Sequence, residues 1–194
     1  AVGVEERPAV GARVEPARRH AAGLPVHGAL EDPREELAVA PVAVCATPGN
    51  WNNEIGLPLS LLAMEAGTKL GVFETGTNHA GEIARLCEVL KPDWGVVTNV
   101  GPVHMEFFGS VEAIAREKAS LLRALPSGGT AVLNRDGGCF EILREACACR
   151  VMTVSLGDKA DYVCVRRGAG KNPTVIRENA SGEELRVAIP VPGE

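Results

Sequence analysis

The stretch that decides the fold is Lys69-Leu-Gly-Val-Phe-Glu-Thr-Gly-Thr-Asn-His-Ala-Gly-Glu82. Residues 70–73 predict a short buried strand that ends at Glu74. Residues 80–90 predict a helix, because apolar residues recur at i, i+3, i+4 and i+7 from Ile83. An open α/β sheet binds its ligands beyond the carboxyl ends of its strands. Glu74, which ends a strand before a glycine turn, therefore predicts a functional site.

Predicted strands and helices alternate on both sides of this stretch. The further strands are 42–45, 94–98, 130–133 and 151–154, and the further helices are 57–66, 110–125 and 140–148. Ser110 is a favourable N-cap for the second of these helices. The alternation has the spacing of βαβ units, so we predict an α/β fold with a parallel sheet flanked by helices.

The alternation ends after Ser155. Three short apolar segments follow at 161–167, 173–178 and 184–189, separated by glycine-rich turns. These segments predict a small antiparallel β extension of the sheet.

Residues 1–40 differ from the rest because they are rich in Pro, Arg, Glu and Ala. They contain weak strand signals at 9–14 and 24–26 and a short helix signal at 34–38. Such a segment is too short to bury a core of its own. We interpret residues 1–40 as the remnant of an N-terminal domain and residues 41–194 as an incomplete second domain.

Composition excludes several classes of protein. The 194 residues are 45% hydrophobic, which indicates a globular chain. The net charge is −5 and no long basic run is present, which argues against nucleic acid as a partner. No apolar run approaches the length of a membrane span. Six cysteines without a C-x-x-C pair, and no signal peptide, predict reduced thiols and a cytoplasmic protein.

Polar clusters follow four of the predicted strands, at residues 49–56, 74–79, 99–106 and 134–138. Any one of them is more commonly an ordinary turn, because Asn and Gly favour turns. The carboxyl ends of parallel strands meet at one edge of a sheet, so their joint placement favours a common site.

Two of these residues have alternative roles. Glu74 and His104 would offer an oxygen and an imidazole at neighbouring strand ends and could bind a divalent cation, or His104 could merely cap a helix or turn. Lys118 lies beside apolar positions of the 110–125 helix. It is either a snorkelling lysine on the helix rim or an amine with a depressed pKa suited to covalent modification or phosphate contact.

Several motifs, in this order, resemble the central domain of the Mur ligases. They are Gly49–Pro58, Glu74–His79, Thr98–Gly109 and the helix that contains Lys118. The resemblance extends from about residue 42 to the end, and residues 24–33 resemble the end of the family's UDP-binding domain. It is greatest to the branch that adds D-alanyl-D-alanine to UDP-N-acetylmuramoyl tripeptide.

The resemblance implies an ATP-dependent ligase of peptidoglycan synthesis, with roles in cell wall biogenesis, cell shape and cell division. ATP phosphorylates a peptide carboxylate, and the amine of the dipeptide then displaces phosphate to form an amide. The implied site residues are Glu74 and His104 as Mg²⁺ ligands, a carbamylated Lys118 for a second Mg²⁺, Asn53 beside the phosphates, Asn134 and Asp136 near the nucleotide, and Asn50, Asn78 and His79 facing the substrate. Metal ions and a lysine-borne carboxylate suit the charge of phosphoryl transfer.

One family motif is missing. Where the resemblance predicts a Thr-Gly-x-x-Gly-Lys-Thr loop after residues 42–44, the sequence continues Cys45-Ala-Thr-Pro-Gly-Asn50, and no G-x-x-x-x-G-K-[ST] occurs anywhere. Gly168–Asn172 imitates the end of that loop, but it falls in a predicted β-turn. We expect weak ATP binding, and little or no ligase activity from this chain alone, which we interpret as an incomplete monomeric copy.

Three other interpretations stay open. The chain could be a Mur ligase of a neighbouring type, although the run Asn52–Gly56 argues against this. It could be a non-catalytic remnant that binds a UDP-sugar peptide. It could also be a generic doubly wound domain whose strand-end clusters coincide by chance.

Overall fold

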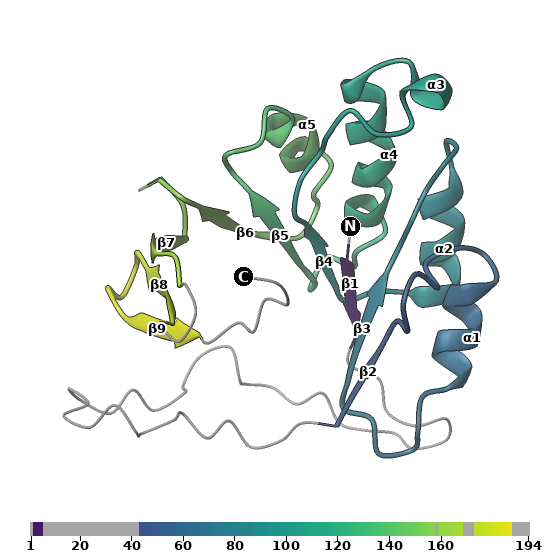
Figure 1. Ribbon diagram of the computed structural model, residues 1–194, viewed down its shortest axis with the longest axis horizontal. Helices are drawn as coiled ribbons and strands as arrows, with labels where there is room; N and C mark the ends of the chain where they lie inside the picture. The colour runs from purple at the N-terminus through teal and green to yellow at the C-terminus, as the bar shows by residue number, and fades with distance from the viewer. Residues whose placement is uncertain (1, 6–42, 158, 169–172, 188–194) are drawn as a thin grey trace.

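The computed structural model describes residues 2–5, 43–157, 159–168 and 173–187 (Figure 1). The strand signals at 9–14 and 24–26 and the helix signal at 34–38 lie outside these residues. Within them, no helix is both long and apolar enough to cross a membrane.

The described strands form one sheet in the order β2-β3-β1-β4-β5-β6-β7-β8-β9. Their bounds are β1 (Val2–Glu5), β2 (Val44–Ala46), β3 (Leu70–Glu74), β4 (Trp94–Val97), β5 (Thr130–Asn134), β6 (Arg150–Ser155), β7 (Tyr162–Arg166), β8 (Thr174–Glu178) and β9 (Glu184–Val187). Strands β4 to β7 pair in parallel, as do β2 and β3. Strands β7, β8 and β9 pair antiparallel. The predicted parallel sheet with a small antiparallel extension is therefore confirmed.

Five helices are described, of which α1, α2, α4 and α5 cover one face of the sheet while α3 packs against α4 (Figure 1). They are α1 (Gly56–Leu62), α2 (Glu82–Leu90), α3 (Met105–Phe108), α4 (Val111–Arg123) and α5 (Phe140–Glu145). Alternate strand residues such as Phe73, Val97 and Leu133 are fully buried beneath them. Burial of each such side chain contributes about 1.5–3 kcal/mol. This core fixes the ends of the strands where the site lies.

Local chemistry explains where the helices begin. Ser110 caps α4 as predicted, because its hydroxyl accepts the Ala113 N–H at 3.1 Å. Helix α2 begins two residues later than predicted, because Gly81 takes a left-handed conformation with φ 87°. Helix α3 was not expected from the sequence. It follows His104, which is also left-handed with φ 54°.

Strand β1 is a correction to the predicted topology. It lies between β3 and β4 and is antiparallel to both, with Val2 opposite Glu74 and Val96. The prediction that the strands bearing Glu74 and His104 are neighbours is therefore wrong. The strand predicted at 42–45 is the edge strand β2, and β1 fills the position between β3 and β4. Since β1 is antiparallel, its C-terminal end lies at the edge opposite Glu74.

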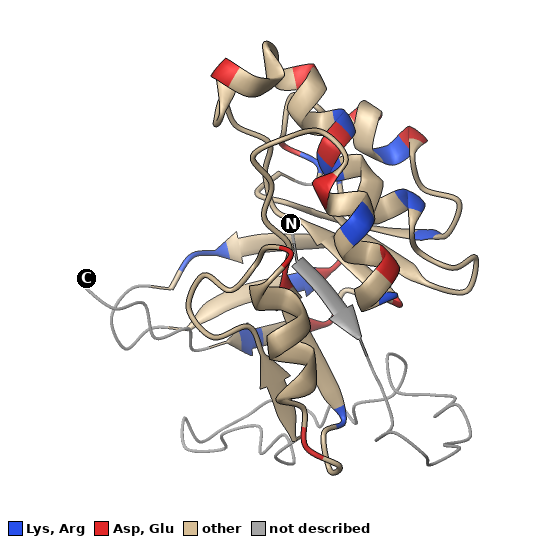
Figure 2. Ribbon diagram, turned by 90° about the vertical axis from the view of Figure 1, so that its right-hand side faces the viewer, with Lys and Arg blue, Asp and Glu red and all other residues tan. Residues whose placement is uncertain are grey.

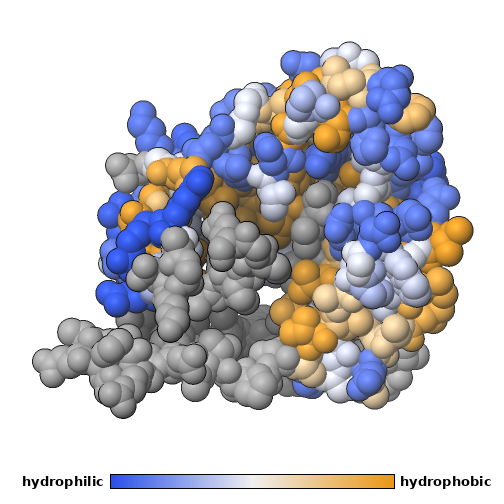
Figure 3. Space-filling model, viewed as in Figure 1, coloured by the Kyte–Doolittle hydropathy of each residue, from blue (hydrophilic) through white to orange (hydrophobic). Residues whose placement is uncertain are grey.

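The surface carries no dominant charge in the view of Figure 2, where acidic and basic residues are interspersed over the helices. Figure 3 shows apolar surface on the side where α1 lies, and Ile55, Leu59 and Leu62 are exposed there.

Candidate active site

A hollow of about 440 Å³ opens where β3 ends. Its walls come from the 52–55 loop, the 74–78 loop, α2 and α4. This volume suits a small-molecule site. It brings together five predicted residues, which are Asn53, Glu74, Asn78, His104 and Lys118.

The Glu74 carboxylate is oriented by the loop after β2. Its Oε1 accepts a hydrogen bond from Asn52 Nδ2 at 2.8 Å, and its backbone N–H donates to Thr47 Oγ1 at 2.8 Å. Gly76 N–H donates to the Asn52 carbonyl at 2.7 Å. A Cβ on Gly76 would lie 2.7 Å from the Asn52 side chain, so this approach requires glycine. The carboxylate is thus held at the mouth of the hollow.

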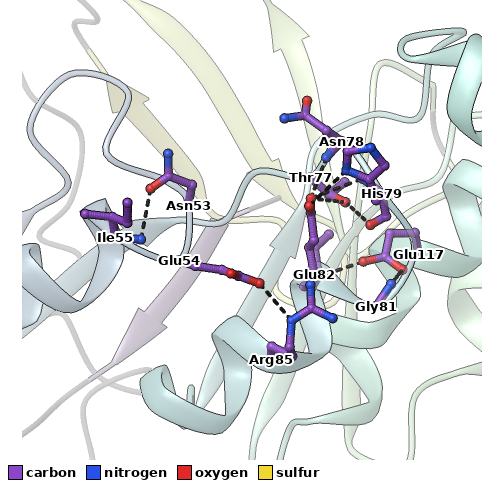
Figure 4. Close-up of polar contacts among 11 residues, drawn as sticks. Asn53, Glu54, Ile55, Thr77, Asn78, His79, Gly81, Glu82, Arg85 and Glu117 are labelled. Carbon is purple, nitrogen blue, oxygen red and sulfur yellow. Dashed lines mark hydrogen bonds and ion pairs between the residues drawn. The ribbon is translucent and has the colours of Figure 1, made fainter.

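Asn53 has a role in the fold as well as a place in the hollow. Its Oδ1 accepts the N–H of Ile55 at 3.1 Å and of Gly56 at 2.9 Å, which caps the start of α1 (Figure 4). The side-chain oxygen is therefore occupied, and the amide nitrogen is the atom suited to meet a phosphate oxygen.

Lys118 is half-buried in α4, and its Nζ donates to the Asn99 carbonyl at 3.3 Å. Burial lowers the pKa of the Lys118 amine, while the charge of Glu74 acts in the opposite direction. A lowered pKa increases the fraction of neutral amine near neutral pH, and only the neutral amine can attack CO₂.

His104 occupies the N-cap position of α3, but its side chain makes no capping hydrogen bond. His104 therefore lies where the helix-capping interpretation places it, although its side chain does not cap the helix. It also lines the hollow. Among the described residues, no group of three or more His, Cys, Asp or Glu could hold a metal ion. Glu74 and His104 fit Mg²⁺ only as part of a set, which a carboxylate on Lys118 would extend.

A buried hydroxyl in the hollow has no partner. Thr75 is 3% exposed, and its Oγ1 makes no hydrogen bond within the described part of the chain. An unpaired buried hydroxyl costs free energy, so this hydroxyl lowers the stability of the loop after β3.

Residues 77–79 are held by Glu82, the first residue of α2. Its Oε2 accepts the N–H of Asn78 at 2.7 Å and of His79 at 3.1 Å, and its Oε1 lies 3.1 Å from His79 Nδ1 (Figure 4). These hydrogen bonds, led by that of the Asn78 N–H, lower the pKa of Glu82 to about 2. The His79 ring lies 4.6 Å from that of Phe107. His79 is 61% exposed and does not line the hollow.

Three predicted residues lie elsewhere. Asn134 Nδ2 donates to the Thr98 carbonyl at 3.0 Å, and its Oδ1 accepts the Asp136 N–H at 2.9 Å. The Asp136 carboxylate accepts bonds from the Ser155 hydroxyl and the Leu156 N–H. The hollow beside Asn134 has a volume of only about 10 Å³. Asn50 is exposed in a turn, where its carbonyl accepts the Asn52 N–H.

Three residues of the site were not selected from the sequence: Asn52, Glu82 and Glu117. Glu117 had a readable signal, because it is three residues after Ile114 and four before Leu121, on the buried face of α4. A charged residue at such a position needs a partner.

Comparison with known proteins identifies the family of the chain. The sequence model of one protein family, the Mur ligase middle domain, matches residues 34–194. The chain belongs to this family.

Individual Mur ligases show how much of the chain is shared. The UDP-N-acetylmuramoyl-tripeptide–D-alanyl-D-alanine ligase of Mycobacterium tuberculosis is 41% identical over 118 residues, which cover 61% of this chain and 23% of that ligase. A MurF structure from Acinetobacter baumannii superposes with a TM-score of 0.67 and 26% identity, covering 79% of this chain and 33% of that one. MurF ligase from Thermotoga maritima, in complex with ADP, gives 0.63 and 29%, covering 75% and 34%. The chain thus spans well under half the length of these relatives.

Proposed function

We propose that this chain is the central part of an ATP-dependent ligase that adds D-alanyl-D-alanine to UDP-N-acetylmuramoyl tripeptide. The γ-phosphoryl group of ATP would pass to the tripeptide carboxylate, releasing ADP. The dipeptide amine would then attack the acyl phosphate, lose a proton and displace phosphate to form the amide. The names of the matched relatives support this choice of substrates.

The observation that carries the proposal is the convergence of three side chains on one hollow in a Mur ligase fold. Glu74, His104 and Lys118 come from segments up to 44 positions apart in sequence and line the same cavity. Mg²⁺, when bound there, would neutralise negative charge on the transferring phosphoryl group. Asn52 would hold the Glu74 carboxylate in place through its 2.8 Å hydrogen bond.

The remaining residues would bind and orient. Asn53 and Asn78 line the hollow, and we assign Asn53 to phosphate and Asn78 to the sugar-peptide substrate. His79 and Asn50 lie outside the hollow, where an extended substrate could reach them. Asn134 and Asp136 would act near the nucleotide only through the loop that their hydrogen bonds shape.

The phosphate loop is the missing part, so we propose that this chain alone has little or no ligase activity. The sequence contains no G-x-x-x-x-G-K-[ST]. Residues 169–172, which imitate the end of that loop, lie outside the described residues, and the strands on either side, β7 and β8, pair antiparallel. Strand β1 brings no C-terminal loop to the edge where Glu74 lies. Backbone N–H groups and a lysine around the β- and γ-phosphates are what ATP binding needs there.

The role of Lys118 can be tested on the chain as it is. We expect ¹³C-bicarbonate to give a carbamate resonance in the wild-type protein and in Lys69→Ala, an exposed lysine that serves as control. Lys118→Ala should lack it. Equal spectra for the wild type and Lys118→Ala would contradict the assignment.

Activity is tested by phosphate release with ATP, Mg²⁺, UDP-N-acetylmuramoyl tripeptide and D-alanyl-D-alanine. We expect no release above the protein-free rate, and robust turnover would refute the inactivity of this chain. Proposed with the function are a cytoplasmic, monomeric protein and a role in cell wall synthesis, cell shape and division.

The missing phosphate loop favours a second candidate, a non-catalytic remnant that binds the UDP-sugar peptide. Calorimetric titration separates the two. Binding of ATP–Mg²⁺ supports the ligase, whereas binding of the sugar peptide alone supports the remnant. A ligase of a neighbouring Mur type would instead accept an amino acid other than the dipeptide.

A further inference from the structure

Glu117 is a buried carboxylate that supports the site but does not line the hollow. It lies on α4 and is 6% exposed. Its Oε2 accepts the N–H of Gly81 at 2.7 Å, and its Oε1 accepts the N–H of Ile83 at 2.9 Å (Figure 4). These N–H groups begin α2, where a helix lacks internal acceptors and carries partial positive charge. The carboxylate of one helix therefore satisfies the start of another.

The start of α2 is in turn connected to the wall of the hollow. Glu82, between the two residues that Glu117 binds, accepts the N–H groups of Asn78 and His79. The 74–79 loop therefore follows the position of α2, and Glu117 sets that position against α4.

The next residue of α4 is Lys118, which lines the hollow. Successive residues of an α-helix point about 100° apart, so one turn of α4 can serve two walls. Glu117 contacts the backbone that leads to the loop, and Lys118 lines the same hollow as that loop. Packing of Ile83 and Cys87 against Leu121 accompanies this polar contact.

We propose that Glu117 is a positioning residue that sets the separation between Lys118 and the loop bearing Glu74 and Asn78. The inference rests on the proposed function for the roles of Glu74 and Lys118. Glutamine at position 117 would place an amide N–H against one of the two backbone N–H donors. Repulsion between the donors moves the loop away from α4, although no atom lining the hollow has been removed.

The experiment compares Glu117→Gln with Glu112→Gln, which removes an exposed carboxylate from the same helix. One measurement is Mg²⁺ affinity by calorimetry. The other is acylation of Lys118 by an amine-reactive ester relative to exposed Lys69, read by peptide mass spectrometry. A merely stabilising carboxylate would lower the denaturation midpoint and leave both readouts of the folded protein unchanged.

We expect Glu117→Gln to weaken Mg²⁺ binding about tenfold, as loss of an orienting contact does at metal sites. We expect Lys118 acylation to rise roughly threefold relative to Lys69, because local opening exposes the amine. Glu112→Gln should change neither. Glu117→Asp, which keeps the charge on a shorter stem, should give intermediate values.

Wild-type values of both readouts in folded Glu117→Gln would overturn the inference. If the wild-type protein binds no Mg²⁺ while Glu117→Gln still speeds acylation, the proposed metal role fails and the positioning role stands. If Glu117→Gln does not fold, Glu117→Asp decides by the same two measurements.

Discussion

The ends of β3 and β5 carry similar sequence signals and differ in what their polar groups do. After β3, Glu74 and the loop to Asn78 face a hollow of about 440 Å³. After β5, Asn134 and Asp136 bond to Thr98, Ser155 and Leu156, beside a hollow of about 10 Å³. Both clusters satisfy the rule that ligands bind beyond strand ends. Only the first leaves groups and space for a ligand.

The difference shows that a strand-end cluster is a site only if its hydrogen-bonding capacity is not already used. At β3 the supporting contacts come from other residues, such as Asn52, which leaves a carboxylate at the mouth. At β5 the carboxylate is itself the support, because it ties the turn after β5 to the end of β6. The variants of Glu74 and Asp136 below test this distinction.

The largest expected effect concerns packing beside the hollow. A Cβ on Gly56 would lie 2.6 Å from the Trp51 backbone, which cannot move aside without reshaping the 50–56 loop. We expect Gly56→Ala to lower the free energy of unfolding by about 3 kcal/mol, measured by urea denaturation. The matched change at β5, Gly138→Ala, meets no atom within 4 Å and should be nearly neutral. Equal midpoints for the two variants would contradict the crowding at Gly56.

The second effect appears at acid pH. The pKa of Glu82 is lowered from 4.5 to about 2, so its stabilisation is present above pH 4.5 and is lost as the pH falls to 2. We expect this loss to reach about 2 kcal/mol in the wild type and to be absent from Glu82→Gln. Urea midpoints measured across this range provide the check. The control is Glu88→Gln, an exposed position on α2, which should keep the wild-type acid sensitivity.

The β5 cluster should behave similarly on a smaller scale. Hydrogen bonds from Ser155 and Leu156 lower the pKa of Asp136 below 3.8, so it also loses stabilisation as the pH falls through that range. Asp136→Asn should therefore show a weaker acid dependence than the wild type. If the stability of Asp136→Asn falls with pH as steeply as that of the wild type, the carboxylate does not tie the turn after β5 to the end of β6.

The third effect compares the two carboxylates as metal ligands. We expect Glu74→Gln to weaken Mg²⁺ binding at least about tenfold by calorimetry. Asp136→Asn should leave the affinity unchanged, because its carboxylate is engaged with Ser155 and Leu156. An equal loss of Mg²⁺ affinity in Asp136→Asn and Glu74→Gln would contradict the assignment of metal binding to the β3 cluster alone.

The smallest effect is expected at the rim of the hollow. Arg85 Nε lies 2.7 Å from Glu54 Oε1, but both side chains are more than half exposed (Figure 4). Water screens such pairs, so Arg85→Ala should leave the thermal midpoint unchanged. A clear drop would show that this exposed pair matters as much as the buried carboxylate of Glu117.

The sequence predicts most of the sheet and helices between residues 70 and 155, because apolar periodicity there is strong and the turns contain glycine. Strand β1 could not be predicted from the sequence, because four residues carry little pattern and their partners β3 and β4 lie more than 60 positions away. Helix α3 has only four residues and depends on the left-handed backbone of His104.

Of the four strand-end clusters that the sequence placed at one site, three contribute to the hollow and the 134–138 cluster does not. Five of nine chosen residues line the hollow: Asn53, Glu74, Asn78, His104 and Lys118. The sequence did not reveal which polar side chains are already hydrogen-bonded to other residues of the protein, as those of Asn134 and Asp136 are. Such bonds depend on loop conformation, which residue type alone does not determine. The role of Glu117 depends on how α2 and α4 pack together. Its charge at a buried position of a helix indicates only that it needs a partner.

The placement of β1 has a consequence for how the chain folds. Within the described sheet, β2 and β3 share no ladder hydrogen bonds with β4 to β9, and β1 pairs with both groups. Joining them through β1 requires closure of chain loops that span most of the distance from residue 5 to residue 94, whereas β4, β5 and β6 assemble from near neighbours. The packing of α2 against α4 already joins the two groups through nearby parts of the chain. The pairing of β1 with β3 and β4 should therefore be the last step of folding and the first to reopen.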